Sequence, residues 1–267
     1  MAPAAPPAAQ TAALAFDRVT RAFPGDGGST VTAIHNVSFA VQSQEFVAIV
    51  GPSGCGKSTI LNLTAGLDSP SSGHVAVGGE RVEGPNAHVG FMLQKDLLLP
   101  WRTIVRNVEF GLEARGVSKA DRRSRAMAEL ARCKIADFAH HYPYQLSGGM
   151  RQRAALARTL AISPDLVLLD EPFSALDAQT KMLLQRSFGR TIAETGTNTL
   201  LITHDLSEAV AMADRILVMS ERPGTVVEEI KVDLPDRDNP IQRRAHPRAG
   251  AYIARLFELM RLEERAA

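Results

Sequence analysis

The stretch that most constrains how this chain can fold is Glu45–Leu67, EFVAIVGPSGCGKSTILNLTAGL. Phe46–Val50 is an unbroken apolar run, which is typical of a short strand buried on both faces of a parallel sheet. Residues 51–58 then match the pattern G-x-x-x-x-G-K-[ST], and the residues after them have helical spacing. One face of that helix comprises Ile60, Leu63, Thr64 and Leu67. The sequence therefore predicts a strand, a glycine-rich loop and a helix in direct succession.

The loop between this strand and this helix has the residue types that bind phosphate. Its glycines let the backbone bend so that consecutive N–H groups point inward, and the helix that begins near Lys57 adds the positive end of its dipole. Lys57 supplies a charge for the β- and γ-phosphates, and the Ser58 hydroxyl can ligate a bridging Mg²⁺. The loop indicates nucleotide binding, and by itself it leaves open a kinase, a GTPase, a helicase or a transport ATPase.

The chain contains two cysteines, Cys55 in this loop and Cys133 in a stretch of helical spacing. So few cysteines argue against a disulfide framework and for a reducing compartment. Because Cys55 lies beside Lys57 at the start of a helix, we expect a thiolate that thiol reagents modify and that bound nucleotide shields.

Charge and hydropathy exclude several classes of protein. The 30 Lys and Arg residues nearly balance the 29 Asp and Glu residues, which is not the balance of a nucleic-acid-binding protein. We therefore expect no nucleic-acid partner. The Ala- and Pro-rich start predicts a disordered tail over residues 1–13, and no apolar run approaches the roughly 18 residues needed to span a bilayer. These features predict a cytoplasmic protein whose role at a membrane would need a partner.

The rest of the chain predicts an α/β fold. Residues 14–42 contain three short strand patterns around a Gly-rich turn, which predicts an antiparallel edge. Helical spacing over about 100–162 predicts a helical insertion, and afterwards strands and helices alternate as in a doubly wound parallel sheet. We expect one domain over 14–235, with a helical subdomain at about 100–162, and a C-terminal tail over 236–267 that carries a short helix.

Two adjacent acids follow a second buried strand. Leu166–Leu169 is apolar, and Asp170 and Glu171 come directly after it. Successive side chains on a strand point to opposite sides, so Asp170 can face a metal ion while Glu171, where the chain leaves the sheet, faces an attacking water. This pair predicts hydrolysis of the bound nucleotide.

A second loop with phosphate-binding character lies at residues 147–149. Ser147, Gly148 and Gly149 stand directly before a helical stretch, where they make another phosphate-binding helix start. One subunit has no obvious use for two such sites. In a two-fold dimer, each ATP can instead lie between the phosphate loop of one subunit and the Ser147 loop of the other.

With these motifs in this order, the chain resembles the nucleotide-binding subunit of an ATP-binding cassette (ABC) transporter from about Leu14 to Ile230. The resemblance implies a P-loop NTPase fold, the ABC ATPase, with a RecA-like parallel sheet core, an antiparallel β edge subdomain and a helical insertion. It implies an ATP hydrolase with ATP and Mg²⁺ as its cofactors. LSGGM at 146–150 matches the family's signature and SALD at 174–177 its inter-subunit loop, and a P-loop kinase would account for neither.

The same resemblance assigns roles to individual residues. The implied catalytic residues are Glu171 as general base, His204 as the switch that contacts the γ-phosphate, Gln94 as the sensor of Mg²⁺ and of the membrane partner, and Lys57. The implied metal ligands are Ser58, Gln94 and Asp170. The implied ATP-binding residues are Phe23, which stacks on adenine, and Gly51, Pro52, Ser53, Gly54, Cys55, Gly56, Lys57, Ser58, Thr59, Ser147, Gly148, Gly149 and Asp177.

Two longer phrases narrow the family. FMLQKDLLLPWRTIVRNVEFGLEARG at 91–116 and THDLSEAVAMADRILVMSERPG at 203–224 resemble the nitrate/sulfonate/taurine importer family. This implies a homodimer, closed as a head-to-tail ATP sandwich, that energises bacterial import of a small oxyanion: an aliphatic sulfonate, taurine or nitrate. The implied partners are integral membrane permease subunits and a periplasmic or lipoprotein solute-binding protein. The implied location is peripheral, on the cytoplasmic face of the bacterial inner (plasma) membrane.

Two alternatives stay open at this point. One is an importer ATPase for another small solute, such as a thiamine precursor, and the other is a soluble ABC ATPase without a transport role. A single cassette with a short helical insertion favours transport over the soluble class. For a transporter, the apolar cluster of Leu97, Leu98, Leu99 and Trp101 beside Gln94 predicts the surface on which the permease docks, around Gln94–Arg102.

Overall fold

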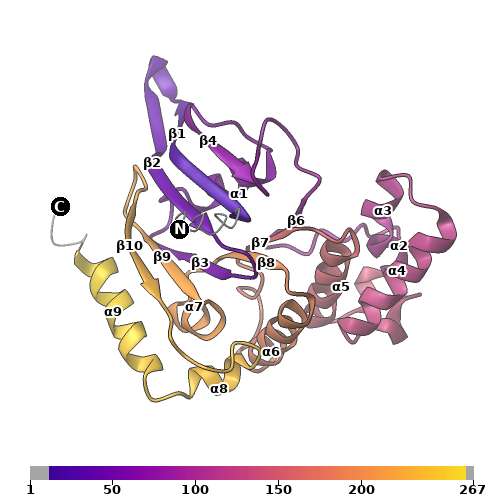
Figure 1. Cartoon of the computed structure of the whole chain (residues 1–267). Coiled ribbons are helices and arrows are strands. Elements are labelled where there is room, and N and C mark those ends of the chain that lie inside the picture. Colours follow the sequence, from indigo (N-terminus) through magenta and orange to yellow (C-terminus); the bar gives the residue numbers. More distant parts are fainter. Residues whose placement is uncertain (1–11, 263–267) are drawn as a thin grey trace, which may run out of the picture.

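A six-stranded sheet forms the centre of the fold (Figure 1). The computed structural model describes residues 12–262. The strand order is β10-β9-β3-β8-β7-β6, and every pair is parallel except β10 with β9. The bounds are β3 Phe46–Val50, β6 Val89–Met92, β7 Leu166–Asp170, β8 Asn198–Ile202, β9 Arg215–Met219 and β10 Val226–Lys231. All five residues of β3 are buried, as its apolar run predicts.

A second, antiparallel sheet covers one side of the core, with the strand order β2-β1-β4-β5. Its strands are β1 Leu14–Pro24, β2 Thr30–Val41, β4 Ser72–Val77 and β5 Glu80–Arg81. Phe16 and Phe39 stack across β1 and β2 with ring centroids 4.7 Å apart. Ala13 already donates its backbone N–H to Val41 at 2.8 Å, so the ordered chain begins before residue 14. Residues 1–11, most of the segment expected to be a disordered tail, lie outside the described residues.

The region about 100–162 is helical, as its spacing predicts, and lies to one side of the sheet in Figure 1. Its helices are α2 Ile104–Val108, α3 Phe110–Ala114, α4 Lys119–Arg132 and α5 Gly148–Ala161, with 3-10 turns at Ala136–Phe138 and Pro143–Gln145. The Ser118 hydroxyl caps α4 by accepting the backbone N–H of Asp121 at 3.2 Å. Buried residues of α2 to α5 belong to the same hydrophobic cluster as one face of the six-stranded sheet.

The remaining helices are α1 Lys57–Ala65, α6 Ala178–Thr195, α7 Leu206–Met212, α8 Pro240–Arg244 and α9 Ala249–Leu262. Helix α1 ends two residues before Leu67, the last residue of its predicted apolar face, because Gly66 caps it in the left-handed conformation and leaves Leu67 exposed. The segment 236–267, for which the sequence predicts one short helix, contains both α8 and α9. Arg243 and Leu256 of these helices are buried.

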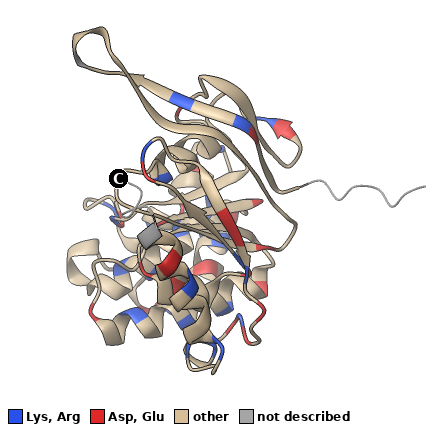
Figure 2. Ribbon diagram, turned by 90° about the vertical axis from the view of Figure 1, so that its left-hand side faces the viewer, with Lys and Arg blue, Asp and Glu red and all other residues tan. Residues whose placement is uncertain are grey.

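Basic and acidic residues are intermingled over the ribbon in Figure 2. The basic and acidic residues, which nearly balance at a net charge of +1, are therefore distributed over the fold together. Among residues 12–262, no helix combines the length and the apolar character needed to cross a membrane.

Candidate functional site

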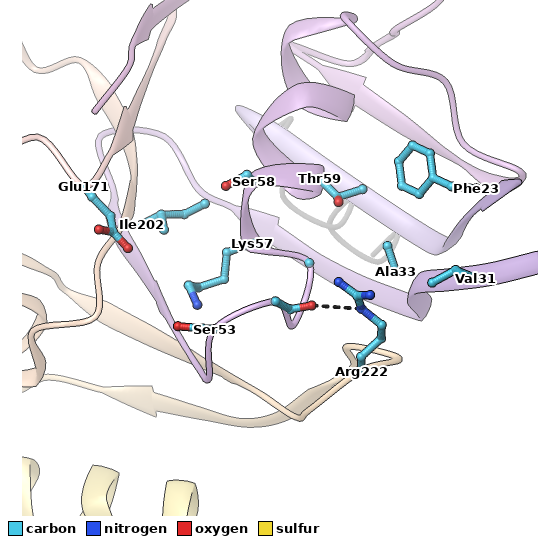
Figure 3. A pocket seen from close by; sticks show the side chains of 12 residues that line it. Phe23, Val31, Ala33, Ser53, Lys57, Ser58, Thr59, Glu171, Ile202 and Arg222 are labelled. Atoms are coloured by element: carbon cyan, nitrogen blue, oxygen red, sulfur yellow. Dashed lines mark hydrogen bonds between the residues drawn. The ribbon is translucent and has the colours of Figure 1, made fainter. Parts of the chain in front are cut away.

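The phosphate loop connects the carboxyl end of β3 to the start of α1 (Figure 3). Gly54 and Gly56 adopt positive φ angles of 80° and 98°, a conformation that side-chain-bearing residues rarely take. A Cβ at Gly56 would also lie 2.4 Å from Ile34 Cγ2 and 2.9 Å from the Ala33 carbonyl oxygen. The loop can therefore wrap around an anion only with glycine at position 56.

Lys57 begins α1 with its side chain buried inside the loop. Its Nζ donates to the carbonyl oxygens of Gly51 and Pro52, each at 2.8 Å. These bonds hold the ammonium across the loop, and Figure 3 shows the Lys57 side chain lying within the loop beside Ser53. A phosphate oxygen would offer that ammonium a charged partner in place of two neutral ones.

A pocket of about 480 Å³ opens beside this loop, between the two sheets. Ser53, Gly54, Gly56, Lys57, Ser58 and Thr59 line it on the loop side. Phe23 lines it from the antiparallel sheet, where the Arg21 guanidinium lies 4.4 Å from the centroid of the Phe23 ring. The pocket thus combines an aromatic side chain with a phosphate-type loop, which are the two kinds of contact that a nucleotide requires.

Arg222 is a pocket residue that the sequence motifs do not reveal. It follows β9 in the chain and donates from Nε to the Gly54 carbonyl oxygen at 3.2 Å (Figure 3). This contact joins residues 168 positions apart. It adds a guanidinium, a planar donor suited to phosphate, at the rim of the loop.

Three polar side chains meet at the carboxyl ends of the neighbouring strands β6, β7 and β8. Glu171 follows β7 with φ of 46°, and its Oε2 lies 3.0 Å from His204 Nδ1. Gln94 Nε2 donates to the same Glu171 oxygen at 3.4 Å and to Ser174 Oγ at 3.1 Å. The carboxylate is therefore oriented from two sides, and it lines the same pocket as Lys57.

Asp170 ends β7 next to this group. Burial raises the pKa of Asp170, the Glu171 charge raises it further, and Lys57 partly opposes both. A carboxylate whose charged form is disfavoured in this way would be stabilised by a cation. Together with the Ser58 hydroxyl and the Gln94 amide, Asp170 offers the hard oxygen ligands that Mg²⁺ prefers, so these residues fit a Mg²⁺ site.

Cys55 differs from the sequence expectation. Its side chain is only 1 % exposed, with Sγ 3.7 Å from Lys57 Nζ. Burial raises the pKa of the Cys55 thiol and outweighs the charge and hydrogen bonds of Lys57. The expected reactive thiolate is therefore wrong: the thiol packs under the phosphate loop as a small apolar group.

The Ser147 loop lies elsewhere. Ser147 caps α5 by accepting the backbone N–H of Met150 at 3.4 Å, and it is exposed. Neither it nor Gly148 nor Gly149 lines the pocket described above, and α5 stands apart from α1 in Figure 1. Gly149 instead packs closely on α6, since a Cβ there would lie 2.8 Å from Thr180 Cγ2.

Asp177 lies close to this second loop, at the start of α6. Its Oδ1 accepts the backbone N–H of Thr180 at 3.0 Å, and this hydrogen bond lowers the pKa of Asp177. Of the predicted residues, the pocket thus brings together Phe23, Glu171 and most of the phosphate loop, and Glu171 in turn contacts His204 and Gln94. Gly51, Pro52 and Cys55 belong to the same loop but do not line the pocket. The chain keeps Ser147, Gly148, Gly149 and Asp177 on a separate surface.

The apolar cluster expected at the permease surface is divided by the fold. Leu98 is 7 % exposed and belongs to the core, whereas Trp101 is 72 % exposed. Trp101 forms part of the rim of a groove of about 1000 Å³ on the helical region. Arg102, Arg106, Arg122 and Arg123 also line this groove, together with Glu109 and Glu113.

Comparisons with known proteins identify the family to which the chain is similar. The profile of the family described as ABC transporter matches residues 34–174. The taurine import ATP-binding protein TauB of Yersinia pestis bv. Antiqua is 48 % identical over 205 residues, which cover 77 % of this chain and 80 % of the relative. The nitrate import ATP-binding protein NrtD of Synechocystis sp. is 42 % identical over 251 residues, which cover 92 % and 94 %. The dimeric structure of MJ0796, a bacterial ABC transporter cassette, has a TM-score of 0.72 at 33 % identity and covers 82 % of this chain and 98 % of that one.

Proposed function

This chain belongs to the ABC transporter family and is an ATP hydrolase coupled to transport, and we propose that it energises bacterial import of a small oxyanion. The oxyanion is an aliphatic sulfonate, taurine or nitrate. Relatives named for taurine import and for nitrate import support this substrate class. The family assignment and the α/β cassette fold predicted from the sequence are confirmed.

The observation that carries the proposed chemistry is that His204 and Gln94 both contact Glu171, which lines the pocket that also holds Lys57. Glu171 orients the attacking water and accepts its proton, because its carboxylate stands beside the phosphate loop and is held by two neighbours. His204 contacts the γ-phosphate and keeps Glu171 in place. Lys57 and the loop N–H groups bind the β- and γ-phosphates, Arg222 adds charge at the rim, and Phe23 stacks on the adenine.

Mg²⁺, held by Ser58, Gln94 and Asp170, would neutralise phosphate charge when ATP is bound. Asp170 then keeps its charged form, because the cation offsets the burial that raises its pKa.

A second copy of the chain completes the site. Ser147, Gly148, Gly149 and Asp177 lie away from the pocket of their own chain, and a head-to-tail dimer would bring them to the phosphates bound by the partner. Solved cassettes that resemble this chain are dimeric, which supports this arrangement.

Integral membrane permease subunits dock on the groove around Trp101, and the chain is thereby held peripherally on the cytoplasmic face of the inner membrane. An exposed aromatic residue beside the Gln94 segment supports this surface. Trp101→Glu should abolish transport in the assembled transporter while the isolated subunit keeps ATP hydrolysis within about twofold of wild type. Val227→Glu, at an exposed apolar position on β10, serves as the matched control and should leave transport intact. Equal transport by the Trp101 variant would remove this surface from the proposal.

The substrate class is tested through the proteins that work with this chain. We would reconstitute it in proteoliposomes with the permease and the periplasmic or lipoprotein solute-binding protein encoded beside its gene. Stimulation of ATP hydrolysis by taurine, an alkanesulfonate or nitrate is the expected result. Stimulation only by a sugar, a peptide or a thiamine precursor would overturn the oxyanion assignment, while the hydrolytic site would stand.

A further inference from the structure

The segment that carries His204 is anchored by a partly buried polar network. Helix α7 starts at the residue after Asp205, whose Oδ1 caps the helix by accepting the backbone N–H of Glu208 at 3.1 Å. The Asp205 backbone N–H donates to Thr203 Oγ1 at 3.0 Å. The backbone on both sides of His204 is therefore fixed by local hydrogen bonds.

Lys181 connects this segment to another helix. It lies in the first turns of α6, and its Nζ lies 2.8 Å from Asp205 Oδ2 and 3.0 Å from Glu208 Oε2. The Glu208 residue is only 1 % exposed. Burial disfavours the Asp205 carboxylate, yet hydrogen bonds from Lys181 and from the Glu208 backbone outweigh it and lower the Asp205 pKa. One ammonium thus serves two carboxylates.

Two further side chains close the network. Gln185, one turn after Lys181, donates from Nε2 to Glu208 Oε2 at 3.0 Å. Arg244 of α8 donates to Gln185 Oε1 at 2.8 Å and to Ser207 Oγ at 2.7 Å. Helices α6, α7 and α8 therefore share one set of partly buried polar contacts, and Lys181 is its central cation.

Helix α6 begins directly after the loop 174–177. Asp177 caps the helix, and its carbonyl oxygen accepts the backbone N–H of Lys181 at 2.9 Å. The loop that the proposed dimer sets against the partner is thus one helical turn from a side chain that grips the His204 segment. A shift of this loop would move Lys181, and through its two ion pairs it would move the start of α7.

We propose that Lys181 is a positioning residue for hydrolysis, which keeps His204 at hydrogen-bond distance from Glu171 and links that distance to the position of loop 174–177. This inference rests on the proposed function and concerns the same site. Without the ammonium, the partly exposed Asp205 carboxylate and the buried Glu208 side chain lose their shared partner, so the start of α7 and His204 shift. Hydrolysis then slows, while ATP binding by the phosphate loop is preserved.

The test compares Lys181→Met in two backgrounds, wild type and His204→Ala, by single-turnover ATP hydrolysis with enzyme in excess. If Lys181 acts through His204, the substitution lowers the rate about tenfold in the wild-type background and less than about twofold in the His204→Ala background. Equilibrium binding of a fluorescent ATP analogue should stay within about twofold in all variants. Lys181→Arg, which keeps the charge, should recover most of the rate.

Controls separate positioning from general destabilisation. If Lys181→Met folds poorly, Asp205→Asn takes its place in the test. Asp205→Asn can still cap α7 but loses the ion pair with Lys181, so it should lower the hydrolysis rate in the same way. Arg215→Met removes an equally exposed cation, since both side chains are 18 % exposed, from an ion pair with Glu45. Arg215 starts β9, at the end of the strand away from the phosphate loop, and its loss should leave the rate within about twofold of wild type.

Two results would overturn the inference: an equal fold loss in both backgrounds, or no loss in the wild-type background. Either would leave hydrolysis by the wild-type protein intact. Failure of the proposed chemistry would instead appear as hydrolysis by His204→Ala at the wild-type rate.

Discussion

The region around the phosphate loop, residues 51–58, and the region around Ser147 both carry phosphate-binding elements. The first region forms a lined pocket within one chain, and the second does not. Around the phosphate loop, one chain supplies a lined pocket, a cation, an aromatic side chain and an oriented carboxylate. Around Ser147, the chain supplies the exposed start of α5 and, next to it, Asp177 at the start of α6. Neither lines that pocket. The difference teaches that one subunit alone supplies the pocket and the oriented carboxylate, whereas in the proposed dimer a second subunit would close the site over the nucleotide.

The largest effect should come from the oriented carboxylate. Glu171→Gln keeps the shape of the side chain and removes the proton acceptor, so hydrolysis should slow by about 10² to 10⁴ while ATP binding is preserved. The ATP-bound dimer should accumulate, which gel filtration with Mg²⁺ and ATP measures. A variant that stays monomeric and hydrolyses ATP at a near wild-type rate would show that hydrolysis at the phosphate-loop pocket does not depend on the Glu171 carboxylate.

A smaller effect, of a different kind, is expected at the loop itself. Lys57→Ala removes a charge that contacts phosphates before and during the reaction, so the affinity for ATP should fall about tenfold or more. Isothermal titration calorimetry of the single subunit measures this change, and Arg151→Ala, on the helix that follows Ser147, is the comparison. If both variants weakened ATP binding by the single subunit equally, the two regions would not differ as described.

The smallest effect concerns the Cys55 thiol of the phosphate loop. Because burial raises the pKa of Cys55, the thiolate fraction near neutral pH falls, and alkylation should be slow and should rise with pH. The same holds for Cys133, whose pKa burial raises to about 12. Mass spectrometry after iodoacetamide treatment should find both thiols unmodified until the protein unfolds. Rapid labelling of Cys55 that ATP blocks would restore the expectation drawn from the sequence.

Sequence motifs predict the parts of the site that depend on local chain geometry. The phosphate loop needs glycine at 56 because its own turn demands it, and Glu171 stands where it does because β7 ends one residue earlier. These features span a few residues each, so one sequence suffices to find them. The alternation of strands and helices likewise predicts the parallel sheet.

Features that depend on packing between distant segments are not predictable in this way. Cys55 lies against the backbone of Gly224, where a Cβ would be 1.9 Å from the Cys55 carbonyl oxygen, and this contact joins residues far apart in the chain. Arg222 likewise reaches the phosphate loop from far along the chain. Leu98 and Trp101 are both large, uncharged side chains three residues apart, yet one enters the core and the other faces outward. Only the fold distinguishes them.

The most direct test of the composite site mixes two inactive variants. Lys57→Ala disables the phosphate-loop region, and Ser147→Arg blocks the other region with a bulky cation at an exposed position. In a mixed dimer, one of the two sites combines the intact phosphate loop of one chain with the intact Ser147 loop of the other. Steady-state ATP hydrolysis by the mixture should therefore recover to on the order of a tenth or more of wild type, although each variant alone is inactive. A mixture no more active than the sum of its parts would contradict a site shared between two chains.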